Sequence, residues 1–148
     1  MIPPFTSTGV LPPGIHVATW EDLTRQFANN TRRKEICEGL RRAALGLARA
    51  GCRRLWIDGS FVSARAIPSD WDGCWDPVGV APALLDSVLL DFTPGGRHRM
   101  KTKYLADLFP SSIQEAQSGL LFVDYFQIDK VTGDLKGIVL LELARSIP

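Results

Sequence analysis

The sequence lacks an excess of charge of either sign. Its 148 residues include 17 Lys and Arg against 16 Asp and Glu, so the formal net charge is only +1. Proteins that coat nucleic acid, or that bind anionic membranes through a polybasic segment, depend on excess positive charge. The balance argues against both classes and leaves only a local basic patch for contact with RNA or DNA.

Cysteine is scarce and irregularly spaced. The three cysteines, Cys37, Cys52 and Cys74, form no C-x-x-C pair. A disulfide framework or a zinc ribbon is therefore not expected. We predict instead that the three thiols are small buried side chains in a protein kept in a reducing compartment.

Long apolar runs are also missing. No segment approaches the roughly 18 apolar residues of a membrane span. The first residues, MIPPFTSTGVLPPG, lack the basic and the continuous apolar regions of a signal peptide. From these features we expect a soluble, cytoplasmic protein without a membrane partner.

Several common catalytic motifs are absent. The two histidines, His16 and His98, lie in loop-like contexts and support neither a Ser-His triad nor a zinc site. No G-x-x-x-x-G-K-[ST] motif occurs, which excludes a P-loop. An EF-hand aligned on Gly73 would place Pro68 at its first ligand position and therefore fails.

What the chain does contain is enough apolar material for one core. Hydrophobic residues make up 45% and charged residues 22%, and this length supports a single domain over residues 1–148. Residues 1–18 are predicted to form an extended, proline-rich arm, because proline fixes φ and lacks an N–H. Its use as a proline-rich ligand for another protein is the alternative.

The patterning along the chain predicts an α+β (α/β-like) domain, a mixed sheet flanked by helices. Helices are expected near 19–27, over 31–50 and over 80–92, and the last of them should end before Pro94-Gly95-Gly96. Strands are expected over 53–58, 70–75 and 101–109. A C-terminal β-hairpin is expected from the segments 122–129 and 137–143, joined around a Gly-Asp turn.

Most charged side chains are predicted to be solvated. This applies to Asp76 at the end of its strand and to Lys130 and Lys136 beside the hairpin turn. It applies also to the arginines of the 31–50 helix, for which a surface that faces phosphate or RNA is the alternative. The dense basic run from Arg97 to Lys103 is either a solvated loop or a surface that binds phosphate.

The segment from Ile57 to Asp76 carries the candidate chemistry. A Gly59-Ser60 turn follows an apolar strand, and Asp70 and Asp72 come ten and twelve residues after the serine. Alternate side chains of a strand share a face, so the two carboxylates project together. Paired carboxylates suit Mg²⁺, and a Gly-Ser turn lets backbone N–H groups approach a phosphate. The alternative is that Asp70 and Asp72 only stabilise local turns through hydrogen bonds to the backbone and have no part in a site.

This combination resembles the DNA polymerase β-like nucleotidyltransferases, especially their small "minimal" members, whose signature is Gly-Ser followed at about ten residues by Asp-x-Asp. The resemblance covers about 53–111, which it makes the metal and nucleotide core. This sequence departs from the family pattern at Trp71 and Gly73, which flank Asp72 where the family prefers aliphatic residues.

The resemblance implies a third carboxylate on a later strand, for which Asp107 is the first choice and Asp124 the second. Asp70, Asp72 and Asp107 would be catalytic and would hold Mg²⁺ or Mn²⁺, while Gly59, Ser60 and Arg65 would bind a nucleoside triphosphate. The acceptor would be a hydroxyl of a protein, an RNA or a small molecule.

Some minimal members act in toxin–antitoxin or defence pairs, which suggests a protein partner. Two other functions stay open. The first is a degenerate nucleotidyltransferase fold that binds protein or nucleotide without catalysis. The second is a structural subunit of a larger assembly, which no repeat in the sequence supports.

Overall fold

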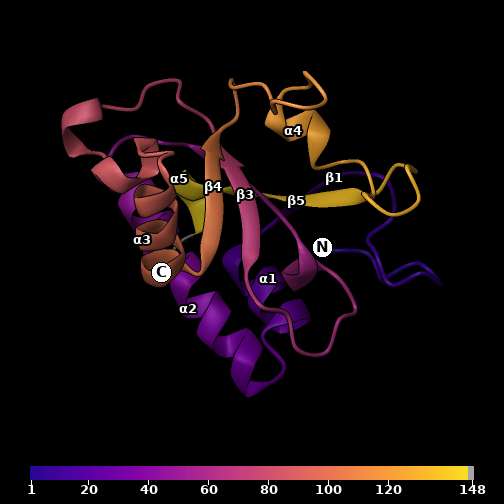
Figure 1. Cartoon of the computed structure of the whole chain (residues 1–148). Helices are drawn as coiled ribbons and strands as arrows, with labels where there is room; N and C mark the ends of the chain where they lie inside the picture. The colour runs from indigo at the N-terminus through magenta and orange to yellow at the C-terminus, as the bar shows by residue number, and fades with distance from the viewer. Residues whose placement is uncertain (147–148) are drawn as a thin grey trace.

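Five strands form one mixed sheet in the computed structural model, which describes residues 1–146 (Figure 1). The strand order is β1-β5-β2-β3-β4. The strands are β1 (Gly14–Ala18), β2 (Arg54–Asp58), β3 (Trp71–Trp75), β4 (Ala106–Pro110) and β5 (Gly137–Glu142); the helices are α1 (Trp20–Phe27), α2 (Thr31–Arg49), α3 (Pro94–Tyr104), α4 (Phe122–Tyr125) and α5 (Leu143–Ser146). The expected α+β class is confirmed.

The pairing directions bring three strand ends together. β2 runs antiparallel to β3 and β5, whereas β3 is parallel to β4 and β1 is parallel to β5. The last residue of β2 therefore lies at the same end of the sheet as the first residues of β3 and β4. In the register, Asp58 is opposite Asp72, and Asp72 is opposite Asp107.

The first two helices begin where the sequence places them. Thr19 caps α1 in a capping box with Asp22, which satisfies two backbone donors at the helix start. Asn30 rather than Thr31 caps α2, because its side chain accepts the N–H of Arg33. Gly51 follows α2 with a φ of 99°, a conformation that favours glycine.

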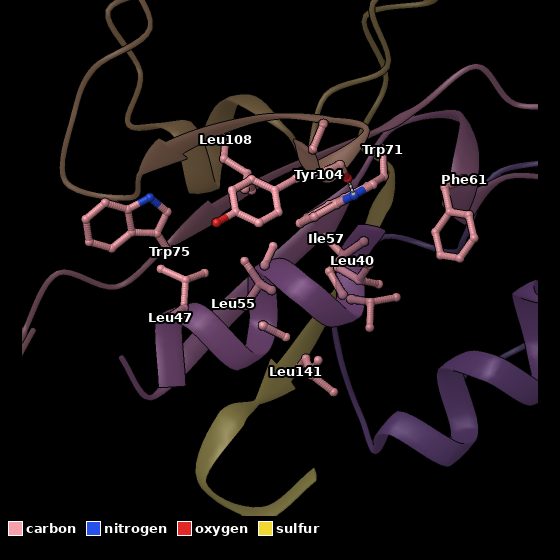
Figure 2. Packing of buried hydrophobic residues seen from close by; sticks show 14 of the residues in the cluster. Leu40, Leu47, Leu55, Ile57, Phe61, Trp71, Trp75, Tyr104, Leu108 and Leu141 are labelled. Carbon is pink, nitrogen blue, oxygen red and sulfur yellow. Dashed lines mark hydrogen bonds between the residues drawn. The ribbon is translucent and has the colours of Figure 1, made fainter. Parts of the chain in front are cut away.

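One face of the sheet, called here the helix face, packs against α1, α2 and α3. Alternate strand residues supply it, among them Leu55, Ile57, Trp71 and Trp75, which are nearly or fully buried. Figure 2 shows these side chains against Leu40 and Leu47 of α2, and the hydrogen bond from the Trp71 indole to the carbonyl oxygen of Tyr104 at 2.8 Å.

The opposite face, called here the carboxylate face, carries Asp58, Asp72 and Asp107 at one end. A second apolar cluster covers the remainder of its central strands, where Phe122 and Phe126 pack on Trp56, Cys74, Ile138 and Leu140. The short helix α4 thus lies across the sheet from α2 (Figure 1).

The predicted helix over 80–92 is wrong. Two 3₁₀ turns, Pro82–Leu84 and Ser87–Leu90, replace it. Asp86 interrupts the segment because its carboxylate accepts the N–H of Val88 and also binds Lys103 and Tyr104. The apolar side chains Leu85, Val88 and Leu89 are still buried, so the periodicity indicated burial correctly and the element incorrectly.

The expected break at Pro94-Gly95-Gly96 is the start of a helix. Thr93 caps α3 by accepting the N–H of Gly96, and Pro94 occupies a first-turn position that tolerates proline. A Cβ on Gly96 would lie 2.2 Å from the Asp91 carboxyl carbon, so this glycine permits close packing. Lys101 to Tyr104, predicted as strand, end the helix, and β4 begins only at Ala106.

The predicted C-terminal hairpin does not form. Phe122–Tyr125 is helix α4, and the isolated bridge between Ile128 and Leu135 joins the first segment only to residues that precede the second. β5 lies instead between β1 and β2. Its residues Ile138 to Leu141 are all buried, which is typical of a central strand with both faces covered.

The proline-rich arm ends in an edge strand. β1 begins at Gly14 and pairs with β5 on one side, while Ile2 and Leu11 anchor the preceding segment in the core. An edge position agrees with the expectation that this part of the chain is extended.

The three cysteines are buried, and no disulfide occurs among residues 1–146. None of the helices within that range is long and apolar enough to cross a membrane.

Candidate active site

Three aspartates form a row across the carboxylate face. Asp58 ends β2, Asp72 is the second residue of β3 and Asp107 is the second residue of β4. Because register partners in neighbouring strands share a face, the three side chains are neighbours. Two of the three predicted carboxylates, Asp72 and Asp107, are therefore adjacent.

Asp72 lies against the glycine of the Gly-Ser turn. Gly59 has a φ of 91°, and a Cβ at this position would come within 2.8 Å of the Asp72 Oδ2 atom. Only glycine satisfies both the backbone conformation and the close approach. The Gly-Ser and Asp-x-Asp motifs thus meet in space, as their spacing predicts.

The flanking residues Trp71 and Gly73 leave β3 regular. A Cβ on Gly73 would lie 2.8 Å from the Trp71 ring and 2.6 Å from the Trp56 carbonyl oxygen. The departure from the family pattern therefore has a packing reason, because glycine makes room for the tryptophan on the helix face.

Two cations of α3 bind the carboxylates. The Lys101 Nζ atom is 3.0 Å from the Asp70 Oδ2 atom and 3.3 Å from the Asp107 Oδ2 atom, and Arg97 lies 3.4 Å from the same Asp107 oxygen. Arg97 and Lys101 are one helical turn apart and so point to one side of α3. The hydrogen bond to Asp70 is the main cause of a raised pKa of the Lys101 ammonium.

Holding these carboxylates close together raises the free energy of the folded state. Burial, and then the charges of Asp70, Asp58 and Asp107, raise the pKa of Asp72 to about 7. The Asp107 Oδ1 atom is buried and has no hydrogen-bond partner among the residues that the structure describes. A cation at this position would stabilise both groups.

Asp58 was not singled out by the sequence motif. Its side chain is 5% exposed and pairs with Lys136, which was predicted to be exposed but is itself 16% exposed. Burial raises the pKa of Asp58, and the Lys136 ammonium opposes that rise. Its place at the end of an apolar strand, directly before Gly59, was the signal available in the sequence.

Ser60 and Arg65 lie in the loop after β2. The Ser60 hydroxyl donates to the Asp70 carbonyl oxygen at 3.5 Å, which places it beside the acidic motif. Arg65 instead lines a cavity with Phe5, Gln26 and Arg33. The structure brings Ser60 to the backbone of Asp70 and puts Arg65 at another cavity.

Two further charged residues differ from the predicted solvated state. Arg33 is 3% exposed, and its guanidinium donates to the carbonyl oxygens of Phe27, Phe61, Ser63 and Arg65. It therefore holds the loop that carries Ser60.

Asp76, expected to be exposed at the end of its strand, is 7% exposed. It pairs with Arg54 at 2.7 Å, and that pairing offsets the cost of burying its carboxylate.

Asp124, the second choice for the third carboxylate, lies in α4 and is exposed. Asp107 is the residue that the register places beside Asp72. As they stand, no three His, Cys, Asp or Glu side chains within residues 1–146 are gathered in a group that could hold a metal ion. Between Asp70 and Asp107 lies the Lys101 ammonium.

The chain belongs to the family DUF6932, described as a family of unknown function, whose model matches residues 3–142. Neither a curated protein nor a solved structure matches the chain.

Proposed function

We propose that this DUF6932 protein is a Mg²⁺-dependent nucleotidyltransferase that moves a nucleoside monophosphate from a nucleoside triphosphate to a hydroxyl group. The acceptor is a protein, an RNA or a small molecule. The observation that carries the proposal is the meeting of Gly59, Asp72 and Asp107 at one end of the sheet, in the register described above. A toxin–antitoxin or defence partner is a further prediction from the resemblance.

The chemistry of the donor set suits a hard cation, and binding one requires the three carboxylates to draw together from the positions described above. Asp70, Asp72 and Asp107 offer carboxylate oxygens, which Mg²⁺ and Mn²⁺ prefer, and the Asp107 Oδ1 atom is buried without a partner in the described part of the chain. A bound divalent cation supplies charge neutralisation at the attacked phosphate and at the leaving pyrophosphate. Loading requires Lys101 to leave its position between Asp70 and Asp107.

The chain's own residues supply the remaining functions. Gly59 exposes backbone next to Asp72, and Ser60 adds a hydroxyl, so this turn is suited to hold the terminal phosphates. Asp107 accepts the proton of the acceptor hydroxyl. Arg97 and Lys101, released from the carboxylates, pair with phosphate oxygens.

A second candidate is a degenerate nucleotidyltransferase fold that binds nucleotide or protein without catalysis. The ion pairs of Lys101 with Asp70 and Asp107 favour it, because an ammonium held there can replace a metal ion permanently. The two candidates differ in whether nucleotide binding needs a divalent cation.

The test is calorimetric titration of the full chain with ATP, in Mg²⁺ and in EDTA. We expect the wild type to bind ATP in Mg²⁺ and to lose at least about tenfold in affinity in EDTA, since two or more carboxylates would otherwise repel the phosphates. Asp70→Asn/Asp72→Asn should bind ATP no better in Mg²⁺ than in EDTA. Transfer of labelled nucleoside monophosphate to a bacterial lysate or RNA then reports catalysis.

Asp124→Asn is the matched control, because it removes one exposed carboxylate outside the row and should leave binding unchanged. Absence of ATP binding by the wild type in Mg²⁺, or equal binding by the double variant, would contradict the proposal. Equal binding with and without Mg²⁺, abolished by Lys101→Met, would support the degenerate fold instead.

A further inference from the structure

Two cavities adjoin the row of aspartates, and they share Arg97 and Asp107. The first, called here the basic pocket, measures about 320 Å³ and is lined by Phe92, Pro94, Arg97, His98, Lys101 and Asp107. The second, called here the aromatic pocket, measures about 290 Å³ and reaches from Asp72 and Asp107 to Phe122, Tyr125, Phe126 and Lys130. A ligand that lies across Asp107 would therefore occupy both.

The basic pocket has the chemistry for phosphate. Within the basic run of α3, Arg99 is paired with Asp91 and Lys103 with Asp86, away from the row. Arg97, His98 and Lys101 are the members that line the pocket. Three donors on one wall suit an oxyanion with several charges.

The aromatic pocket has different chemistry. Phe122 and Tyr125 meet edge to face with their ring centroids 6.1 Å apart, and the Lys130 ammonium lies 5.5 Å from the Tyr125 centroid. Phe109, also in the lining, stacks on Phe122 at 4.0 Å and so cannot offer that ring face to a ligand. Tyr125 is partly exposed, and the Lys130 ammonium lies over one face of its ring. A flat ligand would take the place of that ammonium or contact the other ring face, which makes Tyr125 the ring best placed to contact it.

Size decides how much of a ligand each pocket can hold. Sites for complete small molecules span roughly 300–1,000 Å³, so the aromatic pocket alone, at about 290 Å³, is at the lower limit. A whole nucleoside triphosphate would need both pockets, and its flat uncharged part and its charged part match the two different linings.

We propose that the aromatic pocket holds the nucleobase of the donor nucleotide, with Tyr125 as its stacking partner, while the phosphates extend past Asp72 and Asp107 into the basic pocket. This inference rests on the proposed nucleotidyltransferase function and names the part of the chain that recognises the base. The opposite orientation would place the phosphates beside Glu115 and the aromatic rings, and the base beside Arg97, His98 and Lys101.

The experiment compares two probes, ATP and inorganic tripolyphosphate, both in Mg²⁺, by calorimetric titration of the full chain. Loss of an aromatic side chain that stacks on a base typically weakens binding of the base by about tenfold or more. Tyr125→Leu should therefore weaken ATP binding about tenfold and leave tripolyphosphate binding unchanged. Tyr125→Phe keeps the ring and should bind ATP like the wild type.

Two further variants keep the base subsite testable even if Tyr125→Leu destabilises the fold. Ala116→Trp fills the same pocket from its exposed rim without removing packing, and should cause the same selective loss of ATP affinity. Phe5→Leu removes a partly buried aromatic ring at another cavity and should change neither titration. Melting curves check that each variant is folded.

The outcomes separate this inference from the proposed function. If the wild type binds both probes and Tyr125→Leu and Ala116→Trp weaken both equally, or neither, the base lies elsewhere and the inference is wrong while the proposed function stands. If the wild type binds tripolyphosphate as tightly as ATP, no base subsite exists. If it binds neither probe, the proposed function is overturned and the base subsite with it.

Discussion

The two faces of the sheet bury opposite kinds of side chain from the same strands. In β2, Leu55 and Ile57 turn to the helix face, whereas Asp58 ends the same strand on the carboxylate face. In β3, Trp71 lies under the helices and Asp72 lies in the acidic row. One alternation of period two therefore builds the core and the candidate site together.

The faces differ in what they contribute to the free energy of folding. The helix face removes large apolar side chains from water, which stabilises the fold. The carboxylate face removes charged groups from water, which costs free energy unless each is paired. Asp58 has such a partner in Lys136, whereas Asp72 is surrounded by other carboxylates. A surface that costs stability is typical of a functional site.

The largest effect is expected from Trp71→Ala on the helix face. Trp71 is fully buried, and its indole N–H donates to the Tyr104 carbonyl oxygen. The substitution leaves a cavity and an unpaired carbonyl group, so the free energy of unfolding should fall by about 3–5 kcal/mol. Urea denaturation followed by circular dichroism measures it. A loss of unfolding free energy below about 1 kcal/mol would mean that the helix face tolerates substitution as well as the carboxylate face does.

A slightly smaller effect, confined to one pH range, is expected from Lys136→Met on the carboxylate face. The variant leaves the Asp58 carboxylate buried without its cation, which should cost about 3 kcal/mol at pH 8. The pKa of Asp58 is already raised by burial, and loss of the ammonium raises it further. The cost should shrink as pH falls, because the protonated carboxyl carries no charge.

The control for this ion pair is the double variant Asp58→Asn/Lys136→Met. It removes both charges and should recover most of the lost stability at pH 8, which a double-mutant cycle quantifies. If the double variant is as unstable as Lys136→Met alone, the lysine acts through its packing and not through its charge.

The sequence predicted the elements that alternation or capping specifies. β2, β3, α1 and α2 form within two residues of the expected bounds, because each has a strong period and a clear end signal. The spacing of Gly59, Asp70 and Asp72 was sufficient to predict that the two motifs meet. Asp107 was preferred to Asp124 from its context, and the register places it next to Asp72.

The remaining differences depend on contacts distant in sequence. Asp86 breaks the 80–92 segment by binding Lys103 and Tyr104, and Gly96 allows close approach to Asp91. The partner of Asp58 is 78 residues away. No local pattern reports such pairs, so Lys136 was interpreted as exposed and 122–143 as a hairpin.

The smallest effect, and the one of opposite sign, is expected from Asp72→Asn. The pKa of Asp72 is raised from 3.8 to about 7, mainly by burial. The folded state therefore holds this proton between pH 4 and 7, where the unfolded state has lost it, so the free energy of unfolding falls progressively as pH rises through that range.

Asp72→Asn should remove this pH dependence and raise the free energy of unfolding at pH 8. The full shift corresponds to about 4 kcal/mol, and because Asp72 is only partly buried we expect about 2 kcal/mol after solvent screening. At pH 4 the variant and the wild type should unfold at the same urea concentration. Destabilisation by Asp72→Asn at pH 8 would show that the acidic row supports the fold in the way the helix face does, and the distinction between the two faces would then fail.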